Sequence, residues 1–204
     1  MPPRFRAWVR GCRPAGGGRG VRASVGDLLL ALLLLAHGVA RAQGVSVSVE
    51  NVPGVCRARG VFIVPVPTNV AWQVLTDYAG ISRFVKSVRA SRIERSADGR
   101  KFVRQDAEAN VFMVRRRMQV LMEIEEDPLR RIRFRDVLHD DFKSYAGEWR
   151  LSRVPGATRV DYELAAVPSS GLARTLCRGV LRSSARDLLR QVRAEMLRRA
   201  ARSR

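Results

Sequence analysis

The chain has 204 residues, 46% of them hydrophobic, and carries a formal net charge of +19. Without a leader of about 40 residues, this length fits one domain, which buries roughly 70% of the surface that its unfolded chain exposes. A core of that size excludes a small scaffold that depends on disulfides or metals for stability.

Residues 1–42 have the features of a Sec-type signal peptide, and we expect them to be cleaved. A basic leader precedes a short apolar run from Leu28 to Ala36, and Ala40-Arg41-Ala42 places the cut before Gln43. An uncleaved membrane anchor is the alternative. Because the run falls short of the roughly 20 residues that a spanning helix needs, we favour cleavage and an exported, periplasmic or secreted, protein.

Removal of residues 1–42 takes away seven Arg and one Asp, so the formal charge falls from +19 to +13. A surface with this excess attracts anionic lipid or nucleic acid. Export makes nucleic acid the less favoured partner. Cys56 and Cys177 remain, and an oxidising compartment would allow them to pair. Cysteines this far apart more often lie singly in a core, so a disulfide is left open.

The first elements after the cut are extended. Residues 43–54 form an alternating N-terminal segment, and 55–66 continue it as a second extended run. We expect the two runs to make one long, interrupted first strand. Thr68 is a candidate N-cap for a helix through Tyr78, and a second short helix follows around 81–84.

Hairpin signals follow the two short helices. Asp98-Gly99 is a strong two-residue turn between strands 87–97 and 100–109. Further strands are expected at 111–124, 131–138, 141–151 and 158–167, separated by Asp127-Pro128, a polar turn at 139–141 and Pro155-Gly156. The pattern predicts an antiparallel meander.

A long amphipathic helix ends the chain. Ser169 or Ser170 can cap it, and it runs to about Arg199, roughly 45 Å at 1.5 Å per residue, before a basic tail at 200–204. Its arginines recur at every fourth residue, at 174, 178, 182, 186 and 190. Most such stripes are solvated faces, and peripheral contact with an anionic membrane is the alternative reading.

The strand at 141–151 has the residues of a pocket wall. At a two-residue period, Lys143, Tyr145, Gly147, Trp149 and Leu151 share one face, where a glycine leaves space between two aromatic rings. We expect this face to look inward. The sequence therefore suggests a container sooner than a catalyst.

Two charged residues interrupt otherwise apolar inner faces of the neighbouring strands. Arg116 shares the parity of Phe112, Met118 and Val120, and Asp136 shares the parity of Ile132, Phe134 and Leu138. Because an unpaired buried charge is costly, we expect Arg116 and Asp136 to meet each other or a polar ligand head.

Three stretches resemble the START-like (SRPBCC) superfamily of polyketide cyclase/dehydrase and lipid transport proteins, near its coenzyme-Q-binding branch. They are residues 70–78, Asp141-Phe142-Lys143 with Gly147 and Trp149, and residues 156–160 before the last helix. The resemblance spans 55–199. It implies an α+β helix-grip fold: a curved antiparallel sheet wrapped around the C-terminal helix, with two short helices after the first strand and an apolar cavity.

Our site hypothesis places the polar end of a bound amphiphile at Arg116, with Lys143 beside it. The candidate ligand-binding residues are Phe112, Arg116, Met118, Val120, Phe134, Asp136, Lys143, Tyr145, Trp149, Tyr162 and Leu181. A structural ion pair, or strand ends that reach water, is the alternative for the charged members.

Catalytic and metal signatures are weak. His139 is the one histidine after residue 42, and no partner is spaced for a Ser-His-Asp or Cys-His arrangement. His139-Asp140-Asp141 lacks the usual spacing of metal ligands, so no metal, cofactor or catalytic residue is assigned. We favour an exported carrier or sensor of a lipid, quinone or polyketide-like molecule. The alternatives are a cyclase- or dehydrase-like enzyme using the same cavity, and a module for an anionic macromolecule.

Overall fold

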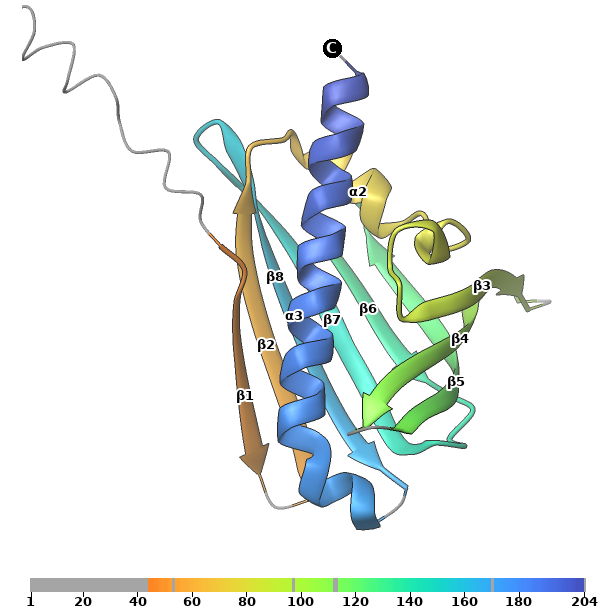
Figure 1. Ribbon diagram of the computed structural model, residues 1–204. Coiled ribbons are helices and arrows are strands. Elements are labelled where there is room, and N and C mark those ends of the chain that lie inside the picture. The colour runs from red at the N-terminus through yellow and green to blue at the C-terminus, as the bar shows by residue number, and fades with distance from the viewer. Residues whose placement is uncertain (1–43, 53, 97, 112–113, 170, 204) are drawn as a thin grey trace, which may run out of the picture. The chain divides into compact units, whose positions relative to one another are not determined.

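The computed structural model describes residues 44–203 apart from 53, 97, 112–113 and 170, and side chains at 51, 109–116 and 171–178 lie outside the description. The described chain forms one antiparallel sheet whose concave face holds a long helix (Figure 1). The predicted signal peptide lies outside the described residues. In the part that is described, no helix is long and apolar enough to cross a membrane.

The sheet has eight strands in the order β1-β2-β8-β7-β6-β5-β4-β3, and every neighbouring pair is antiparallel. The predicted α+β helix-grip fold is therefore confirmed. The strands are β1 (Ser46–Val52), β2 (Val55–Val64), β3 (Val88–Arg95), β4 (Lys101–Val111), β5 (Val114–Asp127), β6 (Arg131–Asp136), β7 (Phe142–Val154) and β8 (Ala157–Pro168).

β1 and β2 form a hairpin, so the expectation of one long, interrupted first strand is wrong. Ser46 pairs with Val61 and Val52 pairs with Val55 in the antiparallel ladder. Gly54 makes the reversal possible, because its φ of +80° lies in the left-handed region that favours glycine. The segment 43–54, expected ahead of the domain, thus supplies the edge strand of the same sheet.

Two short helices follow β2, as predicted: α2 (Thr68–Leu75) and the 3-10 helix η1 (Ile81–Arg83). Thr68 is not the N-cap of α2. That position belongs to Pro67, and Thr68 Oγ1 lies 3.2 Å from the hydroxyl of the fully buried Thr158. Thr158 in turn donates to the Val66 carbonyl at 2.8 Å, which fixes where the chain leaves β2.

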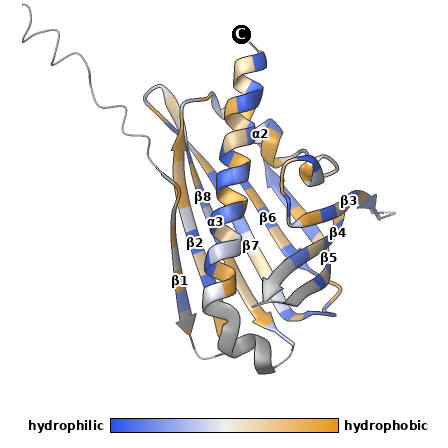
Figure 2. Cartoon of the chain, viewed as in Figure 1, coloured by the Kyte–Doolittle hydropathy of each residue, from blue (hydrophilic) through white to orange (hydrophobic). Residues whose placement is uncertain are grey.

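The helix α3 (Gly171–Arg202) lies along the concave face of the sheet (Figure 1). Leu189, Val192 and Met196 are buried against the sheet, whereas Arg182, Arg186 and Arg190 are exposed. Orange and blue segments alternate along α3 and along the strands in Figure 2, as expected for elements with one buried face.

Two glycines show how closely α3 approaches the sheet. A Cβ atom on Gly60 of β2 would lie 2.2 Å from Leu189 Cδ1, so this glycine lets α3 rest directly on the strand. Among the described atoms, a Cβ atom on Gly179 would meet none within 4 Å, apart from the backbone of α3 itself. Gly179 therefore marks no close approach to the described part of the chain.

Cys56 is buried in β2 and is disulfide-bonded. Cys177, the pairing partner that the sequence left open, lies among the side chains outside the description. The bond joins the start of β2 covalently to another part of the chain.

Candidate functional site

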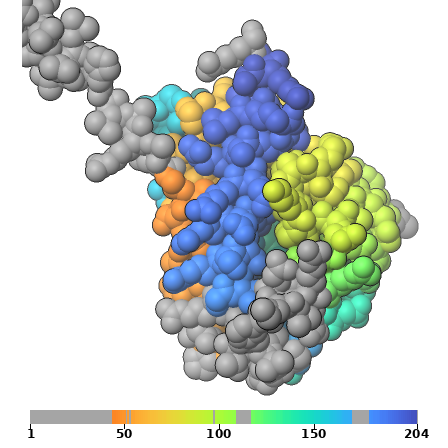
Figure 3. Space-filling model, viewed as in Figure 1, coloured from red at the N-terminus to blue at the C-terminus, as the bar shows by residue number. Residues whose placement is uncertain are grey.

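A cavity of about 320 Å³ lies between the concave face of the sheet and α3. Strands β3 to β8 provide its floor, residues 180–188 of α3 provide one side, and the segment 75–88 covers it. Figure 3 shows the surface hollowed between α3 and the yellow-green segment that contains η1. The volume falls within the range of small-molecule pockets, at its lower end.

Five aromatic side chains of the floor contact one another in a chain. Trp149 and Tyr162 have ring centroids 4.5 Å apart, and Phe134 lies 6.4 Å from Tyr162 and 6.0 Å from Tyr145. Phe142 extends the row at 4.9 Å from Tyr145. These separations are typical of favourable aromatic pairs, so the floor is held rigidly and stays apolar.

The side chains of Tyr145 and Tyr162 both line this floor and carry its two phenol groups. Burial raises the pKa of Tyr145 to about 12 and raises the pKa of Tyr162 well above its usual value, so both remain protonated at neutral pH.

The cover of the cavity is the segment 75–88, which contributes Leu75, Tyr78, Ile81 and Val85. The hydroxyl of Tyr78 donates to Glu126 Oε1 of β5 at 2.7 Å, and Lys101 Nζ donates to the same oxygen at 2.6 Å. Burial, followed by the contact with Glu126, raises the pKa of Tyr78. The cover is therefore attached to β4 and β5.

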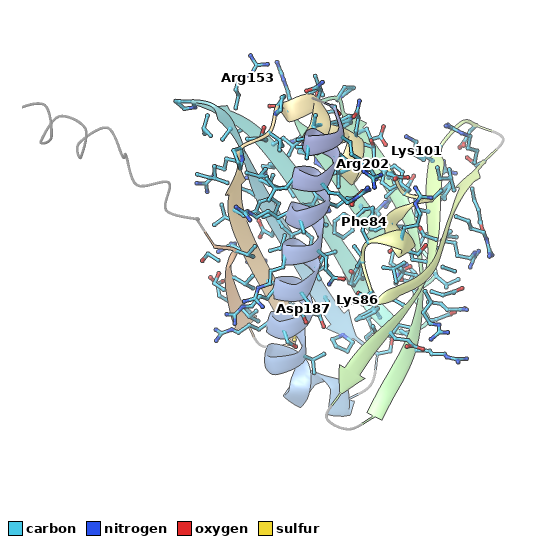
Figure 4. All side chains as sticks on the ribbon, turned by 45° about the horizontal axis from the view of Figure 1, so that its top comes forward. Phe84, Lys86, Lys101, Arg153, Asp187 and Arg202 are labelled. Carbon is cyan, nitrogen blue, oxygen red and sulfur yellow. The ribbon has the colours of Figure 1, made fainter. Side chains whose placement is uncertain are left out.

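The same cover is also attached to α3. Arg199 Nη2 donates to Asp77 Oδ2 at 2.5 Å, and its guanidinium lies 5.8 Å from the ring centroid of Phe84. The backbone amide of Lys86 donates to Gln191 Oε1 at 2.7 Å. Phe84 and Lys86 lie beside the helix in Figure 4. Opening the cavity here requires these contacts to break.

Polar side chains gather where β4, β5 and the start of β7 meet. Ser87, Gln105, Glu108 and Asp141 line the cavity there, and Ser184 lines it from α3. Glu108 forms ion pairs outside the cavity, at 3.0 Å with Arg89 and 3.6 Å with Arg117. Asp141 accepts a hydrogen bond from the Gln119 amide at 3.0 Å. The cavity is thus apolar with one polar end.

Seven of the eleven residues that the sequence suggested line the cavity. They come from β5, β6, β7, β8 and α3, which the fold brings together from positions up to 63 residues apart in the chain. These residues are Met118, Val120, Phe134, Tyr145, Trp149, Tyr162 and Leu181. Phe112 lies outside the described residues, and the side chain of Arg116 lies outside the described side chains.

Lys143 does not line the cavity; its side chain is exposed. The cause is a register shift in β7, where Phe142 pairs with Pro168 and Ser144 pairs with the adjacent Val167. One extra residue at 143 reverses the alternation, so Phe142 and Tyr145 both face inward. Phe142 takes the place that the strand parity gave to Lys143.

Asp136 is buried, yet it does not line the cavity. Its carboxylate accepts hydrogen bonds from the backbone amides of Leu121 at 2.9 Å, Leu138 at 3.2 Å and His139 at 3.0 Å. These bonds satisfy the charge and fix the turn after β6. Asp136 was expected to meet Arg116 or a polar ligand head; the contacts of its carboxylate instead give it a structural role.

Asp136 and Arg116 are too far apart to pair. Asp136 lies opposite Met122 on β5, and Arg116 is six residues further along the same strand. At about 3.3 Å per residue the two backbone positions are about 20 Å apart, which exceeds the reach of an arginine side chain. The register thus excludes the predicted ion pair between these two residues.

The remaining lining residues lie partly in the cover and partly on the inner faces of the strands. The cover residues Leu75 and Tyr78 followed a helical spacing in the sequence, which signals burial and gives no sign of a cavity. Met122, Ile124 and Ile132 had the correct inward parity and do line the floor. Among the described residues, no group of three or more His, Cys, Asp or Glu could hold a metal ion.

Comparison with known proteins places this geometry in context. The family model for "Polyketide cyclase / dehydrase and lipid transport" matches residues 64–193. No curated protein matches the chain. The coenzyme-Q-binding branch receives no support from these comparisons.

Several solved structures are similar to the chain. A protein of Thermus thermophilus is 24% identical with a TM-score of 0.61, covering 71% of this chain and 99% of that one. The Zhui aromatase/cyclase of a Streptomyces species is 19% identical, with a TM-score of 0.63 and coverage of 71% and 95%. A STAR-related lipid transfer protein of Xanthomonas axonopodis is 20% identical, with a TM-score of 0.61 and coverage of 76% and 94%. At these identities the likeness shows the fold.

Proposed function

This chain belongs to the polyketide cyclase/dehydrase and lipid transport family, and we propose that it binds a hydrophobic small molecule in the cavity between the sheet and α3. Candidate classes are a lipid, a quinone and a polyketide-like compound. The observation that carries the proposal is the cavity itself, about 320 Å³ and lined mostly by apolar and aromatic side chains.

The lining would gain free energy from an apolar occupant. Removing apolar surface from water contributes about 25 cal/mol per Å². A well-packed protein interior would not normally leave an empty space as large as several side chains. The rings of the aromatic row from Phe142 to Tyr162 are held in place by contacts with one another, so binding would require little reorganisation of the floor.

A cavity-filling variant tests the proposal. Leu181 lines the cavity from α3, and Ser183, two residues later on the same helix, is exposed. We expect Leu181→Trp to reduce the affinity for an environment-sensitive apolar dye at least tenfold, because the indole occupies the ligand volume. Ser183→Trp is the matched control and should bind the dye like the wild type. Equal affinity in all three proteins would contradict binding in the cavity.

A second candidate is a cyclase- or dehydrase-like enzyme, and the phenol groups of Tyr145 and Tyr162 in the cavity wall favour it. A protonated phenol beside an apolar wall can polarise a carbonyl oxygen of a bound ligand. A folded variant carrying Tyr145→Phe and Tyr162→Phe should then bind the ligand and lose its turnover. If the wild type binds polyketide-like compounds and converts none of them, the enzyme candidate is contradicted and only the carrier function remains.

We also propose export as the cellular setting. The support is the leader pattern of residues 1–42. Expression of the full chain in its own host should yield a protein that begins at Gln43 in the periplasm or medium. An intact leader on a cytoplasmic protein would contradict this and would revive binding to an anionic macromolecule.

Peripheral contact with an anionic membrane is part of the same proposal. Arg182, Arg186 and Arg190 are exposed on the helix that carries Leu181 and Leu188 of the cavity lining. A cationic row of this kind is attracted by anionic lipid, by about 1 kcal/mol per residue near the surface. Vesicles with phosphatidylglycerol should bind the wild type at low salt, and a triple Glu variant at these positions should not bind them.

A further inference from the structure

The two edges of the sheet differ in how they resist a further strand. β3 forms one edge; it carries Arg89, Arg92 and Arg95, and its register with β4 shifts between Val88 and Ala90. Charged side chains and bulges of this kind discourage another strand from pairing. β3 is therefore a protected edge.

β1 forms the opposite edge and lacks these protections (Figure 1). Serine and valine alternate from Ser46 to Val49, and the register with β2 has no shift. The one charged residue of β1, Glu50, is paired with Arg59 of β2 at 3.2 Å. The described part of the chain thus leaves this edge open to a polypeptide in extended conformation.

The open side of β1 offers the backbone groups of alternate residues. The β1–β2 ladder closes at the pair Val52–Val55, which flanks a two-residue turn and is joined by the hydrogen bond of that turn. Bonded pairs recur at every second residue of an antiparallel ladder. Counting back from Val52 leaves Val47 and Val49 between the bonded pairs, so their amides and carbonyls point away from β2.

One side of α3 faces the cavity and the other side faces β1. Leu189 lies over Gly60 of β2, which fixes the part of the helix that rests on the sheet. Leu188 lines the cavity, and it is turned from Leu189 by about 100°. A turn in the opposite sense leads toward β1, because β1 and the strands of the cavity floor lie on opposite sides of β2. α3 contacts β1 as well as β2.

Three exposed arginines lie on the β1 side of α3. Arg182, Arg186 and Arg190 are turned from Leu189 by about 20°, 60° and 100°, in the sense opposite to Leu188. Arg193 is turned the same way, and its Nε donates to the carbonyl of Ile63 at 3.4 Å. By the alternation described above, that carbonyl points from β2 toward the side of β1. The contact therefore agrees with the placement of the other three.

The spacing of these arginines matches that of a strand paired with β1. They recur at every fourth residue, which is about 6 Å along a helix. Side chains on one face of a strand recur at about 6.7 Å. Alternate residues of an added strand would therefore each meet one arginine, and carboxylates at those positions would be complementary to the row.

The chemistry of the edge selects among its possible occupants. Two copies of this chain paired edge to edge would bring the same arginines of both copies together. An anionic membrane neutralises the arginines and leaves the backbone groups of β1 unpaired. We propose that β1 and the row Arg182, Arg186 and Arg190 form a docking site for an acidic segment of another protein, added as an antiparallel strand with Asp or Glu at alternate positions. This site does not depend on ligand binding in the cavity, and a membrane competes for its arginines.

The test uses labelled synthetic peptides, whose affinities are measured by fluorescence anisotropy at low salt. The probe is the blocked peptide Val-Glu-Thr-Glu-Val-Glu-Thr, which has the length of β1 and Glu at every second position. A control of the same composition, Glu-Glu-Glu-Val-Thr-Val-Thr, keeps the charge and loses the spacing. It should bind at least about fivefold more weakly, because it places fewer carboxylates at the arginines.

Methylated forms of the probe test the backbone pairing. In the antiparallel arrangement the Glu amides face Val47 and Val49, whereas the Val and Thr amides face away from β1. N-methylation of the Glu amides should weaken binding at least about tenfold, because it removes the donors to the edge. N-methylation of the Val and Thr amides is the matched control and should change the affinity by less than about threefold.

Protein variants test the arginine row. Arg186→Gln should weaken binding of the probe about threefold, since one exposed charge pair is lost. Arg202→Gln removes the same charge from an exposed position near the end of α3, and should leave the affinity within about twofold of the wild type. Leu181→Trp, which fills the cavity, should bind the probe like the wild type.

Two results would overturn the docking site. The first is equal binding of the alternating, grouped and Glu-methylated peptides, which would mean that the arginines attract any anion, a membrane surface included. The second is no binding of the probe to the wild type at millimolar concentration. Dye binding in the cavity is measured separately, so its failure would contradict the proposed function and leave the docking site standing.

Discussion

The ring of Phe134 lies directly against Gly147, the residue opposite it on the neighbouring strand. A Cβ atom on Gly147 would be 2.6 Å from Phe134 Cζ and 2.2 Å from the backbone oxygen of Glu163. The missing side chain lets an aromatic ring cross the floor of the cavity between Tyr145 and Tyr162. The space that the sequence suggested at this glycine is thus filled by Phe134.

Gly147→Ala should therefore destabilise the protein. We expect a loss of about 2 kcal/mol in the free energy of unfolding, the cost of adding a methyl group to a packed site. Urea unfolding measures it. Because the shortest contact is to backbone, adding Phe134→Leu should restore less than half of the loss. Wild-type stability in Gly147→Ala would contradict the close contact.

Gly179→Ala should have the opposite effect. Outside the backbone of α3, the new methyl group meets no described atom within 4 Å, and alanine favours a helix interior over glycine by about 1 kcal/mol. The same unfolding experiment should show a gain of up to about 1 kcal/mol. A loss of stability would mean that α3 approaches another surface at this position.

Asp136→Asn should lower stability without changing ligand affinity. The carboxylate accepts three backbone amides in a buried turn, and an amide oxygen replaces it with a weaker, single acceptor. We expect a loss of about 2–3 kcal/mol. Dye affinity of the folded variant should match the wild type. Reduced affinity in a variant of unchanged stability would return Asp136 to the binding site.

Glu195 should make stability depend on acid pH. Its hydrogen bonds from Arg198 and Arg199 lower its pKa from 4.5 to about 2. A lowered pKa in the folded state stabilises the fold above pH 4.5, and this contribution is lost as the pH falls toward 2. Thermal melts from about pH 6 to about pH 2 should show a steeper decline for the wild type than for Glu195→Gln. Parallel declines would contradict the pKa shift.

Much of the fold was predictable because local patterns and turn residues specify it. The alternation in β6 places Ile132 and Phe134 inside, and Asp98-Gly99 marks the β3–β4 hairpin. The β1–β2 hairpin was missed because two consecutive extended runs look alike whether they continue or reverse. The reversal depends on Gly54 adopting a positive φ, which the sequence permits without requiring.

The candidate site was less predictable, because it depends on register and on long-range contacts. Parity placed Tyr145 and Trp149 correctly, since they follow the irregularity in β7, and misplaced Lys143, which lies within it. No local signal marks a bulge of this kind. The predicted ion pair between Arg116 and Asp136 was wrong, because strand parity specifies the face of the sheet on which a side chain lies and does not specify its position along the strand.

The central claim is that the cavity holds a hydrophobic small molecule, and native mass spectrometry of protein purified from its own host tests it most directly. The account predicts a mass increment that organic extraction removes, that is present in Ser183→Trp and that is absent in Leu181→Trp. Protein recovered without any bound molecule, together with no uptake from a host lipid extract, would contradict it.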